Sequence, residues 1–316
     1  MSNEVIPRAT GPDGAVRPAG RNADPNTGHV PPRRRALATW LTAFGRFLRT
    51  KPLGALSLAF IVMIVFVAVL APLIAPYDPL MQDRTRISES PSGRYLLGTD
   101  DLGRDILSRL IYGARSSMVI GVATTVISLT LGTILGVVSG FLGKGRDLVI
   151  QRIMDAIQSV PPLVLLLFMA VVLTPSIQGT IIALVVVITP SFNRVARAET
   201  LRIREEFYIE AARATGAGTW RIMTRHVLPN MAAPLLTMSS LLFAGVLIAE
   251  SALSFLGIGT PPPTPSWGLM LSDGVRYTML APWMVIAPGI VLSMAVFAFN
   301  LLGDSLRDFL DPRLQR

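Results

Sequence analysis

Long stretches without a charged residue dominate the hydrophobic pattern of this chain. Residues 53–77, 116–143 and 277–303 each run for 25 to 28 positions without Asp, Glu, Lys or Arg. The hydrocarbon core of a membrane, about 30 Å thick, is crossed by roughly 20 apolar residues in an α-helix. Each of these three stretches therefore predicts one membrane-spanning helix.

Two further regions complete the set of spans. Residues 156–193 form an uncharged stretch of 38 positions, which is too long for one crossing. Thr174-Pro175-Ser176 lies near its middle and predicts a tight turn between two spans, and Pro161-Pro162 predicts a kink in the first of them. Residues 226–249 predict another span, which continues past Glu250 to about Leu256. The fold class expected is an all-α membrane protein with six transmembrane helices within residues 53–305.

The segments outside the spans are of three kinds. Residues 1–35 are rich in Pro, Gly, Asn and Arg, which predicts a disordered tail. Residues 36–52 place large apolar side chains on one face and end in basic residues and Pro52, so an interfacial amphipathic helix is expected. Residues 306–316 form a polar C-terminal tail. The proline-rich segment 259–265 cannot be helical, and we expect an interfacial loop with Trp267 at headgroup level, a re-entrant loop being the alternative.

Charge adds an orientation to this picture. The chain is only 16% charged, against about 25% for a typical soluble protein, and its 29 basic and 20 acidic residues give a net charge of +9. With six spans both termini share a side, and the segments on that side hold 22 basic and 12 acidic residues, against seven of each on the other side. Basic residues are enriched in cytoplasmic loops. Both termini are therefore expected in the cytoplasm.

Several classes of chemistry are excluded by what the sequence lacks. The chain has no Cys and only two His, His29 and His226, which rules out thiolate sites and argues against a multi-histidine metal site. The phosphate-binding pattern G-x-x-x-x-G-K-[ST] is absent, the nearest fragment being Gly143-Lys144-Gly145. We expect no catalytic residue, no metal and no cofactor, and any work driven by ATP must come from a partner.

Within the predicted spans, two features suggest specific roles. Gly132, Gly136 and Gly140 recur every four residues, a spacing that lets helices approach closely; packing within this chain is favoured over a contact between subunits. Glu250 lies near the outer end of the fifth span, close enough to the interface to be partly solvated. Intramembrane acids are costly, so Glu250 is a candidate residue of a substrate pathway.

The segment between the fourth and fifth spans is the most informative part of the chain. Residues 205–215 favour a helix, Gly216 and Gly218 interrupt it, and a second short helix ends before Pro229. Such a pair of helices has no core of its own. Its large apolar residues are expected to be exposed and to need a partner's groove: Phe207, Tyr208, Trp220 and Met223.

This segment resembles the EAA loop of binding-protein-dependent ABC importer permeases. The matching residues are Glu210-Ala211-Ala212, Gly216, and Leu228-Pro229 after a further eleven positions, although His226 stands where the family usually has Ile. The resemblance implies that residues 196–230 form a cytoplasmic coupling loop that fits a cleft on the ATP-hydrolysing subunit. The residues implied in this contact are Glu210, Ala211, Ala212, Gly216, Leu228 and Pro229.

A second resemblance narrows the branch of the family. The segment Leu97-Gly98-Thr99-Asp100 through Gly113-Ala114-Arg115 is similar to the C-type subunit of dipeptide, oligopeptide and nickel permeases, as are Glu250 to Gly257, Pro265 to Gly268 and Phe299 to Arg313. The charged residues of this segment have two possible roles. They form a gate or docking surface for partners, or they form a salt-bridged turn at the membrane surface. The resemblance covers about residues 40–313.

Together the resemblances imply one half of the translocation pathway of an ATP-binding-cassette importer for di- or oligopeptides in the bacterial inner membrane. The implied partners are a second homologous permease, two ATP-binding subunits and an extracytoplasmic substrate-binding protein, with membrane lipid around the spans and no nucleic acid. The same machinery for nickel, glutathione or another small solute is the first alternative. A secondary carrier is less favoured because the sequence shows neither paired intramembrane acids nor an inverted repeat. A scaffold or membrane enzyme that transports nothing is the third.

Overall fold

The computed structural model describes residues 45–310, and this part of the chain is helical, with a single isolated β-bridge between Thr99 and Asp105. The expected tail 1–35, residues 36–44 of the expected amphipathic helix, and residues 311–316 lie outside the described residues. Five helices are long and apolar enough to cross a membrane, and a bent pair would form a sixth span. The five are α2 (Pro52–Val69), α4 (Ile106–Leu142), α7 (Ile177–Arg204), α11 (Ala232–Phe255) and α13 (Trp283–Leu310).

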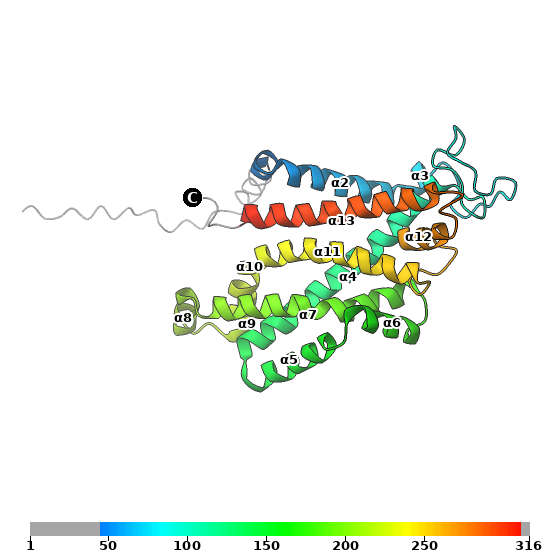
Figure 1. The fold of residues 1–316 in the computed structure, drawn as a ribbon. Coiled ribbons are helices and arrows are strands. Elements are labelled where there is room, and N and C mark those ends of the chain that lie inside the picture. Colours follow the sequence, from blue (N-terminus) through cyan, green and yellow to red (C-terminus); the bar gives the residue numbers. More distant parts are fainter. Residues whose placement is uncertain (1–44, 311–316) are drawn as a thin grey trace, which may run out of the picture. The chain divides into compact units, whose positions relative to one another are not determined.

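The first span is tied to the last at one end of the helix bundle (Figure 1). Residues 45–50 are helical, and the helix stops at Lys51, where Pro52 starts α2. Phe47 is buried and contacts the ring of Phe309 edge to face at 5.4 Å. The Lys51 ammonium lies 2.8 Å from the carboxylate of Asp308. α3 (Ala71–Ile74) follows α2 at its other end.

The second span is longer than its uncharged stretch. α4 has 37 residues and begins at Ile106 rather than near residue 116. Its N-terminus is capped by Asp105, whose carboxylate accepts a hydrogen bond from the Ser108 amide at 2.8 Å. The polar segment before the span therefore continues into it as one helix, roughly 55 Å long at 1.5 Å per residue.

α4 and α7 pack through the glycines of α4. A Cβ atom at Gly132, Gly136 or Gly140 would lie within 3.0 Å of atoms of α7, among them the Ala196 and Thr200 side chains. The glycines let the two backbones approach more closely than larger side chains would permit. Their predicted role in packing within the chain is confirmed.

The third span is bent much more strongly than a kink. α5 (Lys144–Gln158) and α6 (Pro162–Val172) meet at an angle of 90° at Pro161-Pro162. Proline removes a backbone donor and clashes with the preceding turn, so the helix breaks there. The predicted tight turn at Thr174-Pro175-Ser176 follows α6, and Ser176 caps α7 by accepting from the Gly179 amide.

The segment before the last span differs from the expectation. Residues 257–266 are non-helical, as predicted, but they lead into α12 (Trp267–Val275), which packs against α11 and α13. Trp267 is fully buried, and its indole donates to the carbonyl of Leu110 at 3.1 Å. Trp267 therefore starts a helix and is enclosed by the chain instead of lying on a loop, because Gly113 and Gly268 leave room for the ring and the backbone between α4 and α11. That Trp267 lies at headgroup level stays a prediction.

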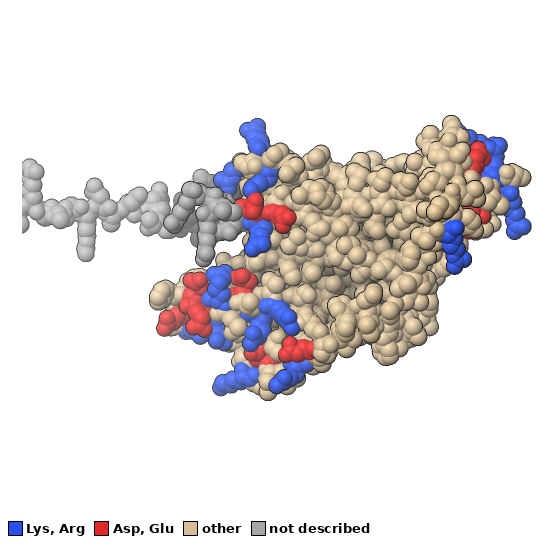
Figure 2. All heavy atoms as spheres, in the orientation of Figure 1, with Lys and Arg blue, Asp and Glu red and all other residues tan. Residues whose placement is uncertain are grey.

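Charged side chains gather at two ends of the helix bundle and leave a broad uncharged band between them (Figure 2). One end, called the α8 end below, holds α8 (Phe207–Ala214), the turn between α4 and α5, and the C-terminal part of α13 (Figure 1). The other, the α12 end, holds α12 and the segment 75–105. This distribution is typical of a chain that spans a membrane.

Candidate coupling surface

The EAA segment forms a compact projection at the α8 end, called the knob below. It consists of α8, a turn at Gly216, α9 (Thr219–Ile222), a π-helical turn (Met223–Val227) and α10 (Leu228–Asn230). The projection ends where α11 enters the uncharged band. The prediction of two short helices interrupted by glycine is confirmed. The prediction that the second helix ends before Pro229 is wrong: helical turns run from Thr219 to Asn230, and Pro229 stands in the first turn of α10, where its missing amide is tolerated.

Gly216 is required by the conformation of the turn. Its φ of +81° lies in the left-handed region, which side chains with a Cβ rarely adopt. The Gly216 amide donates to Arg213 O at 2.9 Å, and the Ala217 amide donates to Ala212 O at 3.0 Å. These two bonds form a Schellman C-cap, which satisfies the last carbonyls of α8 and reverses the chain towards α9.

The inner face of the knob packs on the ends of α4 and α7. Ile209 and Ile222 are fully or almost fully buried in a cluster that includes Phe141 and Ile203. The Arg213 guanidinium lies 5.4 Å from the centroid of the Phe141 ring, a cation–π contact. These contacts join the knob to the ends of both α4 and α7.

The outer face carries large apolar side chains in contact with solvent. Phe207 is 88% exposed, Trp220 73% and Tyr208 43%. Met223 is 5% exposed, so the prediction that it projects outwards is wrong: the π-helical turn directs it inwards. An exposed apolar patch rimmed by charged residues is typical of a protein–protein contact.

The six residues implied by the EAA resemblance fall into two groups on the knob. Glu210 and Ala211 are exposed on α8, Ala212 packs towards the buried cluster, and Gly216 forms the turn. Leu228 and Pro229 lie in α10, at the start of the fifth span, and both are exposed. Their role in coupling to an ATPase stays a prediction.

Glu250 lies inside the chain rather than at its surface. Its side chain has no exposed area, and its carboxylate accepts hydrogen bonds from Ser254 Oγ at 2.8 Å and from Ser117 Oγ at 3.2 Å. The expectation of partial solvation is wrong, because α4 packs across this face of α11 and supplies Ser117. A role in the substrate pathway stays a prediction.

The charges of the segment before α4, for which the sequence left two roles open, form a buried cluster at the α12 end together with Asp273, which the sequence did not single out. Arg109 is 1% exposed; its guanidinium lies 3.3 Å from Asp100 and 3.7 Å from Asp273 of α12. Arg104 Nε pairs with Asp100 at 2.6 Å. Of the two expectations for these charges, the salt-bridged turn describes the geometry, and the cluster ties the segment 75–105 to α12.

The described residues hold no group of three or more His, Cys, Asp or Glu side chains arranged to bind a metal ion. The described residues thus form a bundle of membrane-spanning helices with an apolar knob at one end.

Comparison with known families identifies the class of protein to which the chain belongs. The family model described as "Binding-protein-dependent transport system inner membrane component" matches residues 132–316, more than half of the chain. The chain belongs to this family of permeases. A second model, "N-terminal TM domain of oligopeptide transport permease C", matches residues 39–91 of the permease.

Curated relatives cover most of this permease. It is 44% identical over 269 residues to the Di/tripeptide transport system permease protein DppC of Pseudomonas aeruginosa (strain UCBPP-PA14), covering 83% of this chain and 89% of the relative. It is 40% identical over 284 residues to the Dipeptide transport system permease protein DppC of Escherichia coli (strain K12), covering 88% and 95%. The family predicted from the sequence is confirmed.

A solved structure shares the fold. The permease aligns with a chain of the inward-facing MetNI methionine ABC transporter with a TM-score of 0.53 at 20% identity, covering 64% of this chain and 97% of that chain. The predicted class, an all-helical ABC importer permease fold, is confirmed.

Proposed function

We propose that this permease forms one half of the translocation pathway of an ATP-driven importer for di- and oligopeptides. The relatives that carry dipeptide names match it at 36–44% identity over most of its length, which supports this cargo. A second homologous permease supplies the other half, and an extracytoplasmic binding protein delivers the peptide. Nickel and glutathione are the alternative cargoes that a transport assay must include.

The proposed membrane is the bacterial inner membrane, with the α8 end and both termini in the cytoplasm. The excess of basic residues in the segments assigned to that side supports this orientation. ATP binds to two separate cytoplasmic subunits, and the permease itself holds no cofactor.

The knob is the proposed contact with the ATP-binding subunit, and its exposed outer face carries this proposal. Phe207 and Trp220 are too exposed to stabilise the isolated chain, and a groove on a partner would bury them. Closure of the ATPase pair on ATP would displace the knob. Since Ile209 and Arg213 bind the knob to α4, the displacement passes to the α4–α7 pair and opens the pathway outwards. Hydrolysis then resets it.

The test compares two glycines in the same turn. A Cβ at either Gly216 or Gly218 would meet no atom within 4 Å, but only Gly216 has a positive φ; Gly218 has φ −66°. Valine at position 216 must leave the left-handed region or bear about 1–2 kcal/mol of strain. We expect Gly216→Val to lose most ATP-dependent peptide uptake in proteoliposomes of the assembled complex, and Gly218→Val to retain it.

A second pair of variants tests the contact itself. Trp220→Ala is expected to weaken association with the ATP-binding subunit by at least tenfold, as for a buried aromatic anchor of an interface. Leu73→Ala, an exposed residue at the α12 end, is the control. Unchanged association of the Trp220 variant would contradict the proposed coupling surface. Uptake that survives ATP depletion but collapses with an uncoupler would instead favour a secondary carrier.

A further inference from the structure

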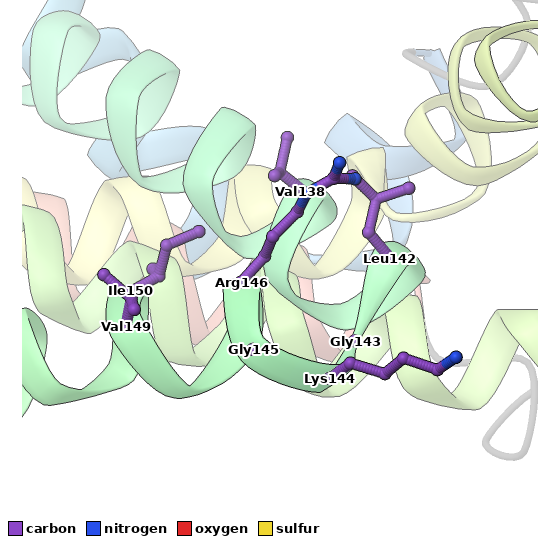
Figure 3. Close-up of a pocket in the computed structure, with 8 residues that line it drawn as sticks. All are labelled: Val138, Leu142, Gly143, Lys144, Gly145, Arg146, Val149 and Ile150. Atoms are coloured by element: carbon purple, nitrogen blue, oxygen red, sulfur yellow. The ribbon is translucent and has the colours of Figure 1, made fainter.

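A groove lies where the last turn of α4 meets the first turns of α5 (Figure 3). Its volume is about 850 Å³, within the range of about 300–1,000 Å³ for small-molecule sites. The chain reverses there through Gly143 and Lys144, whose φ angles are +62° and +52°. The lining residues are Val138, Leu142, Gly143, Lys144, Gly145, Arg146, Val149 and Ile150.

Two exposed cations of this groove have no anionic partner within residues 45–310. Neither Lys144 nor Arg146 forms an ion pair there, while the one acid in the first turn of α5, Asp147, is engaged by Arg197 at 2.7 Å. Figure 3 shows Arg146 extending towards Val138 and Leu142, whereas the Lys144 side chain starts at the turn and points away from these residues. The groove thus presents positive charge beside an aliphatic wall.

The position of the groove indicates which kind of molecule meets both features. The turn between α4 and α5, whose residues line the groove, lies at the α8 end (Figure 1), where the charged side chains border the uncharged band (Figure 2). The apolar wall continues along α5 in Leu148, Val149 and Ile153, which are 60%, 59% and 53% exposed. In a membrane-spanning chain such a face meets hydrocarbon, and cations at its end lie at the depth of the lipid headgroups.

We propose that this groove binds one anionic phospholipid of the cytoplasmic leaflet. Arg146 and Lys144 hold the phosphodiester, and Val138, Leu142 and Ile150 pack against the first methylenes of an acyl chain. Basic pockets between transmembrane helices on the cytoplasmic side bind anionic headgroups in this way. The proposal rests on the proposed orientation of the membrane and not on the cargo.

The bound lipid would bridge α4 and α5 beside the Asp147–Arg197 pair. It would then support the turn from which the third span starts, beside the last turn of α4, which the knob contacts through Arg213 and Phe141. Binding of the lipid is therefore expected to stabilise the turn between α4 and α5 (the corner), and the lipid would not contact the transported molecule.

The test measures lipid retained by the assembled complex in nanodiscs of phosphatidylcholine with and without phosphatidylglycerol, by native mass spectrometry. Lys144→Gln combined with Arg146→Gln is expected to lower the preference for phosphatidylglycerol by up to about 25-fold, taking roughly fivefold for each cation near an anionic surface. Arg152→Gln is the matched control: Arg152 lies on the same helix, is exposed and unpaired within the described residues, and does not line the groove.

Two further variants separate charge from shape. Arg146→Lys keeps the charge and is expected to retain most of the lipid, which also shows that the corner tolerates substitution. Val138→Trp fills the groove with no change of charge and is expected to release the lipid.

Three results would overturn the proposal. The double variant could retain phosphatidylglycerol like the unaltered complex, or Arg152→Gln could lose as much, which would indicate a general charge effect. Loss of an ATP-binding subunit from the double variant with unchanged lipid would assign the corner to a protein contact. Peptide uptake is measured separately, so failure of the lipid site and failure of the proposed transport function are distinguishable.

Discussion

The close approach of α4 and α7 makes a quantitative prediction for Gly136→Ala. A Cβ at position 136 would lie 2.7 Å from the Ala196 Cβ and 2.7 Å from the carbonyl oxygen of Asn193. Carbon atoms in favourable contact are about 3.5–4.0 Å apart, so the methyl group lacks roughly 1 Å of space. Because the Asn193 oxygen belongs to the backbone, relief requires α7 to move away from α4.

The expected change in the free energy of unfolding of Gly136→Ala combines two opposing effects. Overpacking a close contact costs about 1–3 kcal/mol. Replacing glycine by alanine inside a helix stabilises it by about 1 kcal/mol. Gly245→Ala isolates the second term, because Gly245 also lies in a spanning helix but a Cβ there would meet no atom within 4 Å. The free energies of unfolding of the two variants are therefore expected to differ by about 1–3 kcal/mol.

The measurement is unfolding of the purified permease in mixed micelles by titration with denaturing detergent. Gly245→Ala should match or exceed the unaltered protein in stability, and Gly136→Ala should fall below Gly245→Ala. Equal free energies of unfolding for the two variants would refute the inferred contact between α4 and α7. A reduced ratio of peptide imported to ATP hydrolysed in Gly136→Ala would further link this contact to coupling.

Three other changes test separate parts of the molecule. Glu250→Gln is expected to assemble normally and to import peptide more slowly, whereas a wild-type rate would remove Glu250 from the pathway. Asp147→Ala should destabilise the permease by about 1–3 kcal/mol, between the values for exposed and buried ion pairs, since its partner Arg197 is 32% exposed. The exchange of the pair, Asp147→Arg with Arg197→Asp, should restore part of the lost stability. If the exchanged pair is as unstable as Asp147→Ala, a direct pairing is contradicted. Burial and the neighbouring Asp100 raise the pKa of the Asp101 carboxyl above 3.8, so the folded state binds a proton more readily than the unfolded state. Stability from this group should rise as the pH falls from neutrality through the raised pKa towards 3.8, and Asp101→Asn should remove that gain in detergent unfolding curves.

Local features of the sequence predicted most of the helices and their breaks. The apolar stretches predicted the five spans that single helices form, and Pro161-Pro162 predicted the break between α5 and α6, because the effects of hydrophobicity and proline act over a few residues. The turn at Gly216 was predicted for the same reason. The bend of 90° at Pro161-Pro162 was larger than expected, since proline permits a break and the packing partners set its angle.

The sequence alone therefore determined the class of fold, the spans and the knob, whereas burial of single side chains was decided by tertiary structure. Trp267 is buried because its indole reaches the Leu110 carbonyl, 157 positions away, and Glu250 is buried because Ser117 lies across from it, 133 positions away. Met223 turns inwards through a π-helical turn that its neighbours stabilise. Contacts between such distant positions depend on how whole helices pack, and no local pattern of residues contains that information.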